Sequence, residues 1–357
     1  MLFPWTVAFG FAMGAAAGSF TNVLIWRLPR GQSIREPQWS YCPSCNSRLT
    51  FLDLVPLLSF LLLGARCRHC RKPVPWRYFW VELVCASLWG LLWWQNMVVA
   101  WAPAPFLAYA LFGTALVAIV WIDFEHYIIP DQLNAWLLLV GVALGVYRLA
   151  THDPAAWVLI GSLRLPAFLV GAWTGTLILW GIGAFGRILF RKDAMGHGDV
   201  KMMRGAGALL PMDMLLASIG IAVALGAVIG AAMLVYLRAH RMTEEEPEPE
   251  GEQAPEPPEP IALLPIWLFY YLLWLDLLSL LASKAGAAVD GFVLRLAKKV
   301  APEANLGEEE AEETFQPSPT TIAFGPFLAM GVAATLLLAP QIRAAIRAYL
   351  SWVTGGN

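Results

Sequence analysis

The segment 106–131 reads FLAYALFGTALVAIVWIDFEHYIIPD, so a continuous apolar run leads directly into an acidic residue. About 20 mostly apolar residues cross the hydrocarbon layer of a bilayer, and the run that ends at Ile122 is therefore expected to form a membrane-spanning helix. Asp123 follows at once, which places a carboxylate at the membrane surface. Carboxylates in such positions are energetically costly and are therefore candidates for function.

Similar apolar runs recur along the 357 residues, at about 2–25, 78–94, 135–146, 165–185, 206–237, 261–281 and 321–339. Hydrophobic residues make up 58% of the chain and charged residues only 14%, against about 45–50% and 25% in ordinary soluble domains. We expect an all-α polytopic membrane protein with about eight transmembrane helices, rather than a soluble helical core. The N-terminus lacks a basic segment and is interpreted as a retained first span, not as a cleaved signal peptide.

The charged residues predict the orientation. The segment 27–76 holds eight Lys and Arg residues against Glu36 and Asp53. Short loops rich in Lys and Arg remain on the cytoplasmic side. The N-terminus is therefore expected outside, with 27–76 in the cytosol, and alternation of the spans places 123–134 and 187–201 at the cytosolic face as well.

The first cytosolic segment contains four of the five cysteines, arranged as two Cys-x-x-Cys pairs: Cys42, Cys45, Cys67 and Cys70. Two such pairs at about this separation are typical of a four-cysteine zinc site. Since all four positions carry cysteine, no position is left for a catalytic water, and the predicted role is structural. Disulfides are the alternative, but they rarely persist in the cytosol. A further, disfavoured alternative is that His69 replaces one cysteine ligand.

The predicted organisation has five parts. Residues 1–26 form the first transmembrane helix, 27–76 a zinc-binding loop domain, and 77–242 the membrane catalytic core. Residues 243–320 are acidic linkers that flank a membrane-associated helical insertion, and 321–357 are the last transmembrane helix and its tail. Eight Glu and six Pro between 243 and 260 predict a disordered linker. The apolar part of the insertion is expected to lie in the membrane interface, with a full crossing as the alternative.

A second acidic motif, Gly196-His197-Gly198-Asp199-Val200-Lys201, also lies at the cytosolic end of an expected span. Glycines allow close backbone approach, and Gly198 is expected to leave space beside Asp199 for a substrate strand. Asp123 and Asp199 fall on the same membrane face. Two carboxyls at one depth can share a proton, one acting as base toward water and the other as acid, as in aspartic proteases.

Other interpretations remain open on the residues alone. Each aspartate could cap a helix, which is the preferred interpretation for Asp131, at the start of the next span after Pro130. His126 and His197 could join the aspartates in a zinc site, although this is disfavoured. A proton-coupled transporter could use the same two carboxylates, and a non-enzymatic, zinc-anchored assembly factor would need neither. We find no internal repeat, no Gly-x-Ser-x-Gly and no His-Glu-x-x-His motif.

The chain resembles the bacterial type IV prepilin peptidases, which are leader peptidases and N-methyltransferases of the Gly-x-Gly-Asp class of membrane aspartic protease. The resemblance rests on GSFTNVLIWRLP at 18–29, the paired Cys-x-x-Cys loop, and the motifs at 122–131, 196–201 and 324–329. It covers nearly the whole chain. The insertion at 244–319 and a lengthened loop around 151–163 depart from the family pattern, and no family role is transferred to them.

The resemblance implies that Asp123 and Asp199 are catalytic, supported by the motif positions Gly196, Gly198, Lys201, Pro130 and Asp131. It implies removal of the basic leader of type IV prepilins and type II secretion pseudopilins at the cytosolic face of the bacterial inner membrane. It also implies structural Zn²⁺ and N-methylation with S-adenosylmethionine, for which we find no glycine-rich nucleotide loop. Expected partners are these substrates and membrane lipid, not nucleic acid, and the oligomeric state is left open.

Overall fold

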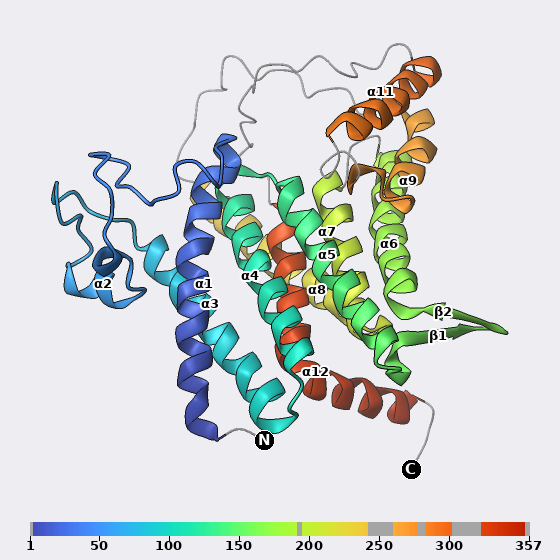
Figure 1. Ribbon diagram of the computed structural model, residues 1–357. Helices are drawn as coiled ribbons and strands as arrows, with labels where there is room; N and C mark the ends of the chain where they lie inside the picture. Colours follow the sequence, from blue (N-terminus) through green and yellow to red (C-terminus); the bar gives the residue numbers. More distant parts are fainter. Residues whose placement is uncertain (1–2, 191–194, 242–259, 278–282, 302–322, 354–357) are drawn as a thin grey trace.

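The computed structural model describes residues 3–190, 195–241, 260–277, 283–301 and 323–353 (Figure 1). Regular structure in these ranges is almost entirely helical, which confirms the expected fold class. The acidic linkers predicted at 243–260 and before the last span lie outside the described residues, apart from Pro260 and Ala301 at their edges.

Six helices of the described ranges are long and apolar enough to cross a membrane. They are α1 (Val7–Arg27), α4 (Pro103–His126), α5 (Asp131–Ala150), α6 (Ala167–Phe190), α8 (Met212–Arg241) and α12 (Gly325–Val353). The expected number of about eight is not confirmed, because two further helices of the bundle are short. The helix α3 (Arg77–Trp93) has 17 residues before a π-helical turn at Trp94–Val99, and α7 (His197–Leu209) has 13.

Small residues let α1 pack directly against α3. Gly10, Gly14 and Gly18 recur at every fourth position and therefore share one face of α1. A Cβ atom at Gly14 would lie 2.5 Å from the Cys85 carbonyl oxygen, and one at Gly18 would lie 2.7 Å from the Glu82 Cα. Backbones of membrane helices approach this closely only where such residues line the interface.

The short helix α7 is enclosed between α5 and α6, again through glycines. A Cβ at Gly171 of α6 would collide with the carbonyl of Gly207 of α7, and a Cβ at Gly207 would collide with the carbonyl of Gly171. On its other side, a Cβ at Gly205 would lie 2.8 Å from the Leu137 Cβ of α5. These contacts hold α7 with little side-chain volume on either flank, and nearly all of its second half is buried.

Helices α8 and α12 form the neighbouring pair. They approach each other closely at Gly331, where a Cβ would collide with the Ser218 carbonyl. Backbone dihedrals depart from helical values at Leu338, next to Pro340, as expected for proline inside a helix. Figure 1 shows the C-terminal part of α12 turning across one end of the bundle. The kink lies at the end of the apolar run 321–339, which was expected to form the last span, while α12 continues to Val353.

Two features lie at opposite ends of the bundle (Figure 1). The strands β1 (Trp157–Ile160) and β2 (Leu163–Pro166) form an antiparallel hairpin that was not predicted; Gly161 supplies the positive φ of 62° for its tight turn. At the other end, α9 (Leu264–Leu272) and α11 (Ser283–Val300) belong to the insertion. With nine residues α9 is only about 14 Å long, too short to cross a bilayer on its own.

The contact between α6 and α7 allows a test of the fold. Gly171→Ala should lower the unfolding free energy by about 1–3 kcal/mol through overpacking, measured by thermal unfolding in detergent. Gly181→Ala lies on the same helix, where a Cβ meets open space. It should be neutral or stabilise by up to about 1 kcal/mol, because alanine is the better helix former. Equal unfolding temperatures for the two variants would contradict the packing described.

Candidate active site and metal centre

Asp123 lies in the last turn of α4 and is 5% exposed. The helix ends there because Tyr127 adopts a left-handed conformation, with φ of 57°, and its N–H donates to the Asp123 carbonyl at 3.0 Å. The chain then turns through Ile129 and Pro130 into α5, which begins at Asp131. This short connection brings Ile129 back toward the Asp123 side chain.

Asp199 lies in the first turn of α7, which begins after Gly196. Unpaired backbone N–H groups and the helix dipole favour a carboxylate at this position. The residue is 7% exposed, and its Oδ1 atom has no hydrogen-bond partner among the described residues. A buried carboxylate oxygen without a donor needs an explanation, and a water or substrate group is the obvious partner.

The carboxyls of Asp123 and Asp199 both lie beside Gly325, the first residue of α12. A Cβ built on Gly325 would collide with Oδ2 of Asp123 and would lie 3.1 Å from Oδ1 of Asp199. Both carboxyl groups therefore border the same point, although they come from helices far apart in sequence. They also line one cavity of about 190 Å³, together with Tyr127, Ile129 and Phe324. The structure thus brings Asp123 and Asp199 together, as their shared face predicted.

This arrangement suits acid–base chemistry on a bound water. Two carboxyls at one site cannot both ionise without strong repulsion, so one holds a proton while the other is available as a base. Water enters a polar cavity of this size readily. The apolar side chains of Ile129 and Phe324 on the cavity wall lower the local dielectric constant, and this strengthens the electrostatic interaction between the two carboxyls.

The supporting motif residues hold α5 against α7. The Lys201 ammonium bonds both carboxylate oxygens of Asp131, at 2.7 and 2.9 Å, and Asn134 Nδ2 donates to the Gly198 carbonyl at 3.3 Å. One expectation needs correction. The space beside Gly198 is not open for a substrate strand, because a Cβ there would lie 2.9 Å from the Ile129 Cβ of the same chain. Glycine is needed here so that the segment after α4 can reach Asp199.

The four paired cysteines form one cluster. Their Sγ atoms all lie within 4.8 Å of one another, and those of Cys42 and Cys70 are 3.9 Å apart. Four sulfurs around zinc, with Zn–S bonds of about 2.3 Å, lie about 3.8 Å apart, so the cluster fits such an ion. The proposed alternative of a zinc site with His126 and His197 finds no support, since the cysteine group is the one metal-compatible cluster in the part of the chain that is described.

Each Cys-x-x-Cys pair folds in the same way. After the second cysteine of each pair, Asn46 and Arg71 take positive φ angles, and their N–H groups donate back to the carbonyls of Cys42 and Cys67. The repeated turn aims two thiols of each pair at one point. Hydrogen bonds from the Ser47 side chain and backbone lower the pKa of the Cys45 thiol to about 6, which favours the thiolate that a metal needs.

The cysteine-bearing loop is attached to the membrane helices by buried polar contacts. Arg27, at the end of α1, donates to four carbonyls of the loop, among them those of Ser33 and Pro37 at 3.0 Å. The Glu82 carboxylate of α3 accepts from the Leu57 N–H at 2.7 Å. A second cavity, of about 200 Å³, lies between the loop and the helices α1 and α3.

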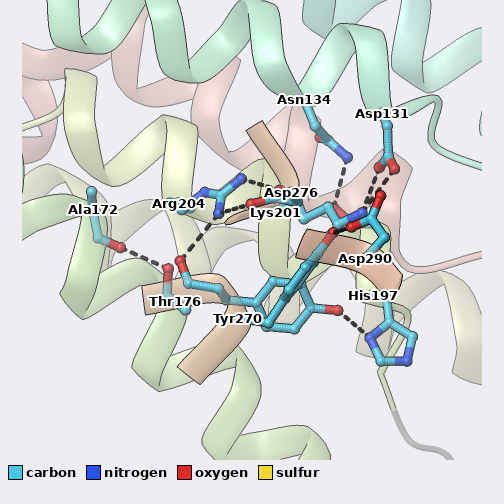
Figure 2. A network of polar contacts seen from close by, with 12 residues as sticks. Asp131, Asn134, Ala172, Thr176, His197, Lys201, Arg204, Tyr270, Asp276 and Asp290 are labelled. Carbon is cyan, nitrogen blue, oxygen red and sulfur yellow. Dashed lines mark hydrogen bonds and ion pairs between the residues drawn. The ribbon is translucent and has the colours of Figure 1, made fainter. Parts of the chain in front are cut away.

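Sequence reasoning missed several residues of this region. Gly325 had been noted only as part of a family motif, although a glycine opening a span could have indicated close contact. Arg204 lies just before one apolar run and Asp276 interrupts another, and two opposite charges in such positions are a signal for a buried pair. Figure 2 shows them facing each other, on α7 and in the insertion.

Comparisons with known proteins identify the family of the chain. The model of the Bacterial Peptidase A24 N-terminal domain matches residues 12–96, and that of the Type IV leader peptidase family matches residues 110–231. A prepilin leader peptidase/N-methyltransferase of Myxococcus xanthus is 33% identical over 99% of this chain and 96% of its own length. The chain belongs to the type IV leader peptidase family. Both acidic motifs fall within the range of the family's model.

Other relatives carry the same name. The protein of Aeromonas hydrophila is 32% identical over 68% of this chain and 87% of its own, and that of Klebsiella pneumoniae is 34% identical over 59% and 90%. No solved structure matches the chain. Residues 243–320 and the last helix, α12, lie outside both family models, whereas the alignment with the Myxococcus xanthus relative covers 99% of this chain.

The position of Gly325 leads to a direct prediction. Gly325→Ala should separate the two carboxyls and lower peptidase activity by about 10²-fold, because misplacement of catalytic groups by about 1 Å has effects of that size. Gly220→Ala on α8, where a Cβ meets open space, is the matched control and should keep full activity. Cleavage of a prepilin in proteoliposomes is the measurement. Full activity in Gly325→Ala would show that the two carboxyls need not meet at this residue.

Proposed function

We propose that this protein is a membrane aspartic endopeptidase in which Asp123 and Asp199 are the catalytic pair. Its substrates are the type IV prepilins and type II secretion pseudopilins, from which it removes the basic leader. The observation that carries the proposal is the meeting of both carboxyls beside Gly325, at the wall of one cavity. Family membership and the names of the relatives support the substrate class.

The reaction is a direct attack of water on the scissile peptide. The ionised carboxylate takes a proton from water while the water oxygen attacks the carbonyl carbon, and the protonated carboxyl donates to the carbonyl oxygen. Collapse of the tetrahedral intermediate breaks the C–N bond, and a carboxyl proton passes to the departing amine nitrogen. No acyl-enzyme forms. The unpaired Oδ1 of Asp199 is available to hold the water.

The orientation follows from charge. We infer a bacterial inner-membrane protein with its N-terminus outside and both carboxyls at the cytosolic face, where the basic loop 27–76 also lies. The ion pair between Arg77 Nη1 and Glu125, at 2.7 Å, supports this, since it joins the end of that loop to the last turn of α4. A prepilin would insert its apolar helix among the spans, with its basic leader in the cytosol and the junction at the carboxyls.

The relatives' names include N-methyltransferase, and we propose the same second activity here, with S-adenosylmethionine as methyl donor. That compound, when bound, supplies an electrophilic methyl group for the new terminal amine. The cavity between α1, α3 and the cysteine loop has polar groups that suit this cationic compound. The Glu82 carboxylate lies in its wall. Asn22 also lies there, and its Oδ1 has no partner among the described residues.

We also propose that the four cysteines hold a structural Zn²⁺. The spacing of the sulfur atoms supports this, and a loop of this length with few apolar residues outside 51–63 needs a crosslink to keep one conformation. The transporter alternative has less support, because the two carboxyls lie in terminal turns of α4 and α7 rather than along a path through the bundle.

The catalytic assignment is tested by Asp123→Asn and Asp199→Asn. Each should lower cleavage of a prepilin by about 10²–10⁴-fold, the usual effect of removing an acid or base, in an assay that separates precursor from product by mass. Asp213→Asn is the control, because Asp213 pairs with Arg343 in an exposed position in the first turn of α8. Substantial cleavage by either motif variant would refute the pair.

The metal assignment is tested by elemental analysis. Purified protein should contain about one zinc ion per chain, and Cys67→Ser should lose most of it, because three thiolates bind more weakly than four. Cys85→Ala removes the buried cysteine of α3, outside the cluster, and should keep its zinc. Equal zinc contents in the two variants would argue against a four-cysteine site.

A further inference from the structure

The insertion is attached to the helix that carries Asp199 by a buried ion pair. Arg204 of α7 is 1% exposed, and its two terminal nitrogens donate to the two carboxylate oxygens of Asp276, at 2.8 and 2.5 Å (Figure 2). The same guanidinium donates to the Tyr271 carbonyl at 3.2 Å. Paired, parallel hydrogen bonds of this kind fix orientation as well as distance.

A second contact lies at the beginning of α7. The Tyr271 hydroxyl forms a hydrogen bond with Nδ1 of His197, and the Trp267 ring meets the His197 ring edge to face at 5.5 Å. His197 is the first residue of α7, two positions before Asp199. The segment 261–277 therefore holds α7 on both sides of Asp199 along the helix.

Other contacts fix the insertion itself. Trp173 of α6 donates to the Leu272 carbonyl at 3.3 Å, and Trp274 and Leu277 pack against the apolar cluster of Leu138, Ala172 and Ala208. The Tyr270 hydroxyl donates to Asp290 of α11 at 3.1 Å. The segment is thus braced against α6 and that cluster, which lie outside the insertion, whereas the bond to Asp290 joins two parts of the insertion to each other.

We propose that the segment 261–277 is a positioning element for the peptidase reaction, with Asp276 and Tyr271 as its positioning residues. The glycine-lined flanks of α7 fix its distance from α5 and α6 but leave few side chains to resist sliding or rotation. The Arg204–Asp276 pair resists both, because a buried guanidinium separated from its carboxylate is left uncompensated. The element acts through α7 on Asp199, so the inference rests on the catalytic role proposed above.

Two matched pairs of variants test this in the full-length protein. Asp276→Asn removes the charge that faces Arg204, and Asp290→Asn removes an acidic partner elsewhere in the insertion. Tyr271→Phe removes the hydroxyl that faces His197, and Tyr270→Phe removes the hydroxyl of its neighbour. The measurements are kcat and KM for cleavage of a prepilin in proteoliposomes, with the unfolding temperature recorded for each variant.

Asp276→Asn should lower kcat by about tenfold or more and change KM by less than about twofold. The substrate still binds, but the Asp199 carboxyl is misplaced. Tyr271→Phe should lower kcat in the same sense, and the two controls should stay near the parent. Unchanged kcat in Asp276→Asn overturns the proposal, as does an equal fall in Asp290→Asn. If the Asp276→Asn protein does not accumulate, the Tyr271→Phe variant is the test. An unchanged kcat in Tyr271→Phe then overturns the proposal.

The outcome also separates this inference from the proposed function. If Asp199→Asn retained its peptidase activity, the proposed catalytic role of Asp199 would be refuted. Loss of activity in Asp199→Asn together with a normal kcat in both Asp276→Asn and Tyr271→Phe would leave the peptidase assignment intact and remove only the positioning role.

Discussion

The backbone-to-backbone contact between α7 and its two neighbours is the constraint on which the site depends. Gly171 and Gly207 leave no room for a side chain between α6 and α7, and Gly205 does the same toward α5. A helix so enclosed can be short and still hold Asp199 at a fixed distance from α5 and α6, because nearly every position of its second half is buried. Dispersion contacts increase as backbones approach, which is how membrane helices associate without a hydrophobic driving force.

The second carboxyl comes to that point by a different route. The helix α4 ends three residues after Asp123, just before a left-handed Tyr127, and the chain returns through Ile129 against Gly198. The beginning of α12 closes the site from a third side, where only glycine fits at Gly325. The end of α4 and the beginnings of α7 and α12 therefore meet at the two aspartates. These contacts depend on glycines, which have no side chain, rather than on a specific side chain.

Charge plays a smaller but complementary part. The Lys201–Asp131 pair and the Arg204–Asp276 pair lie about one turn apart on α7 and attach it to α5 and to the insertion. The Arg204–Asp276 pair is buried, and buried pairs contribute little net stability even though breaking one is costly. The cysteine loop is attached in a similar way, through Arg27 and Glu82, so polar contacts link the extramembrane parts to a core that packs through small residues.

Much of this could be predicted from the sequence, and the reasons are local. Apolar length predicts helices in a membrane, Cys-x-x-Cys spacing predicts a metal cluster, and an aspartate at the end of an apolar run lies at the surface. Those rules placed Asp123, Asp199 and the four cysteines. The expected count of about eight spans is not confirmed, because α3 and α7, with 17 and 13 residues, are shorter than the six candidate spans. The roles of Gly198 and Gly325, and the pairing of Arg204 with Asp276, depend on which segments lie side by side. Only the tertiary structure decides that, since a contact between residues far apart in the chain leaves no periodic signal in either segment.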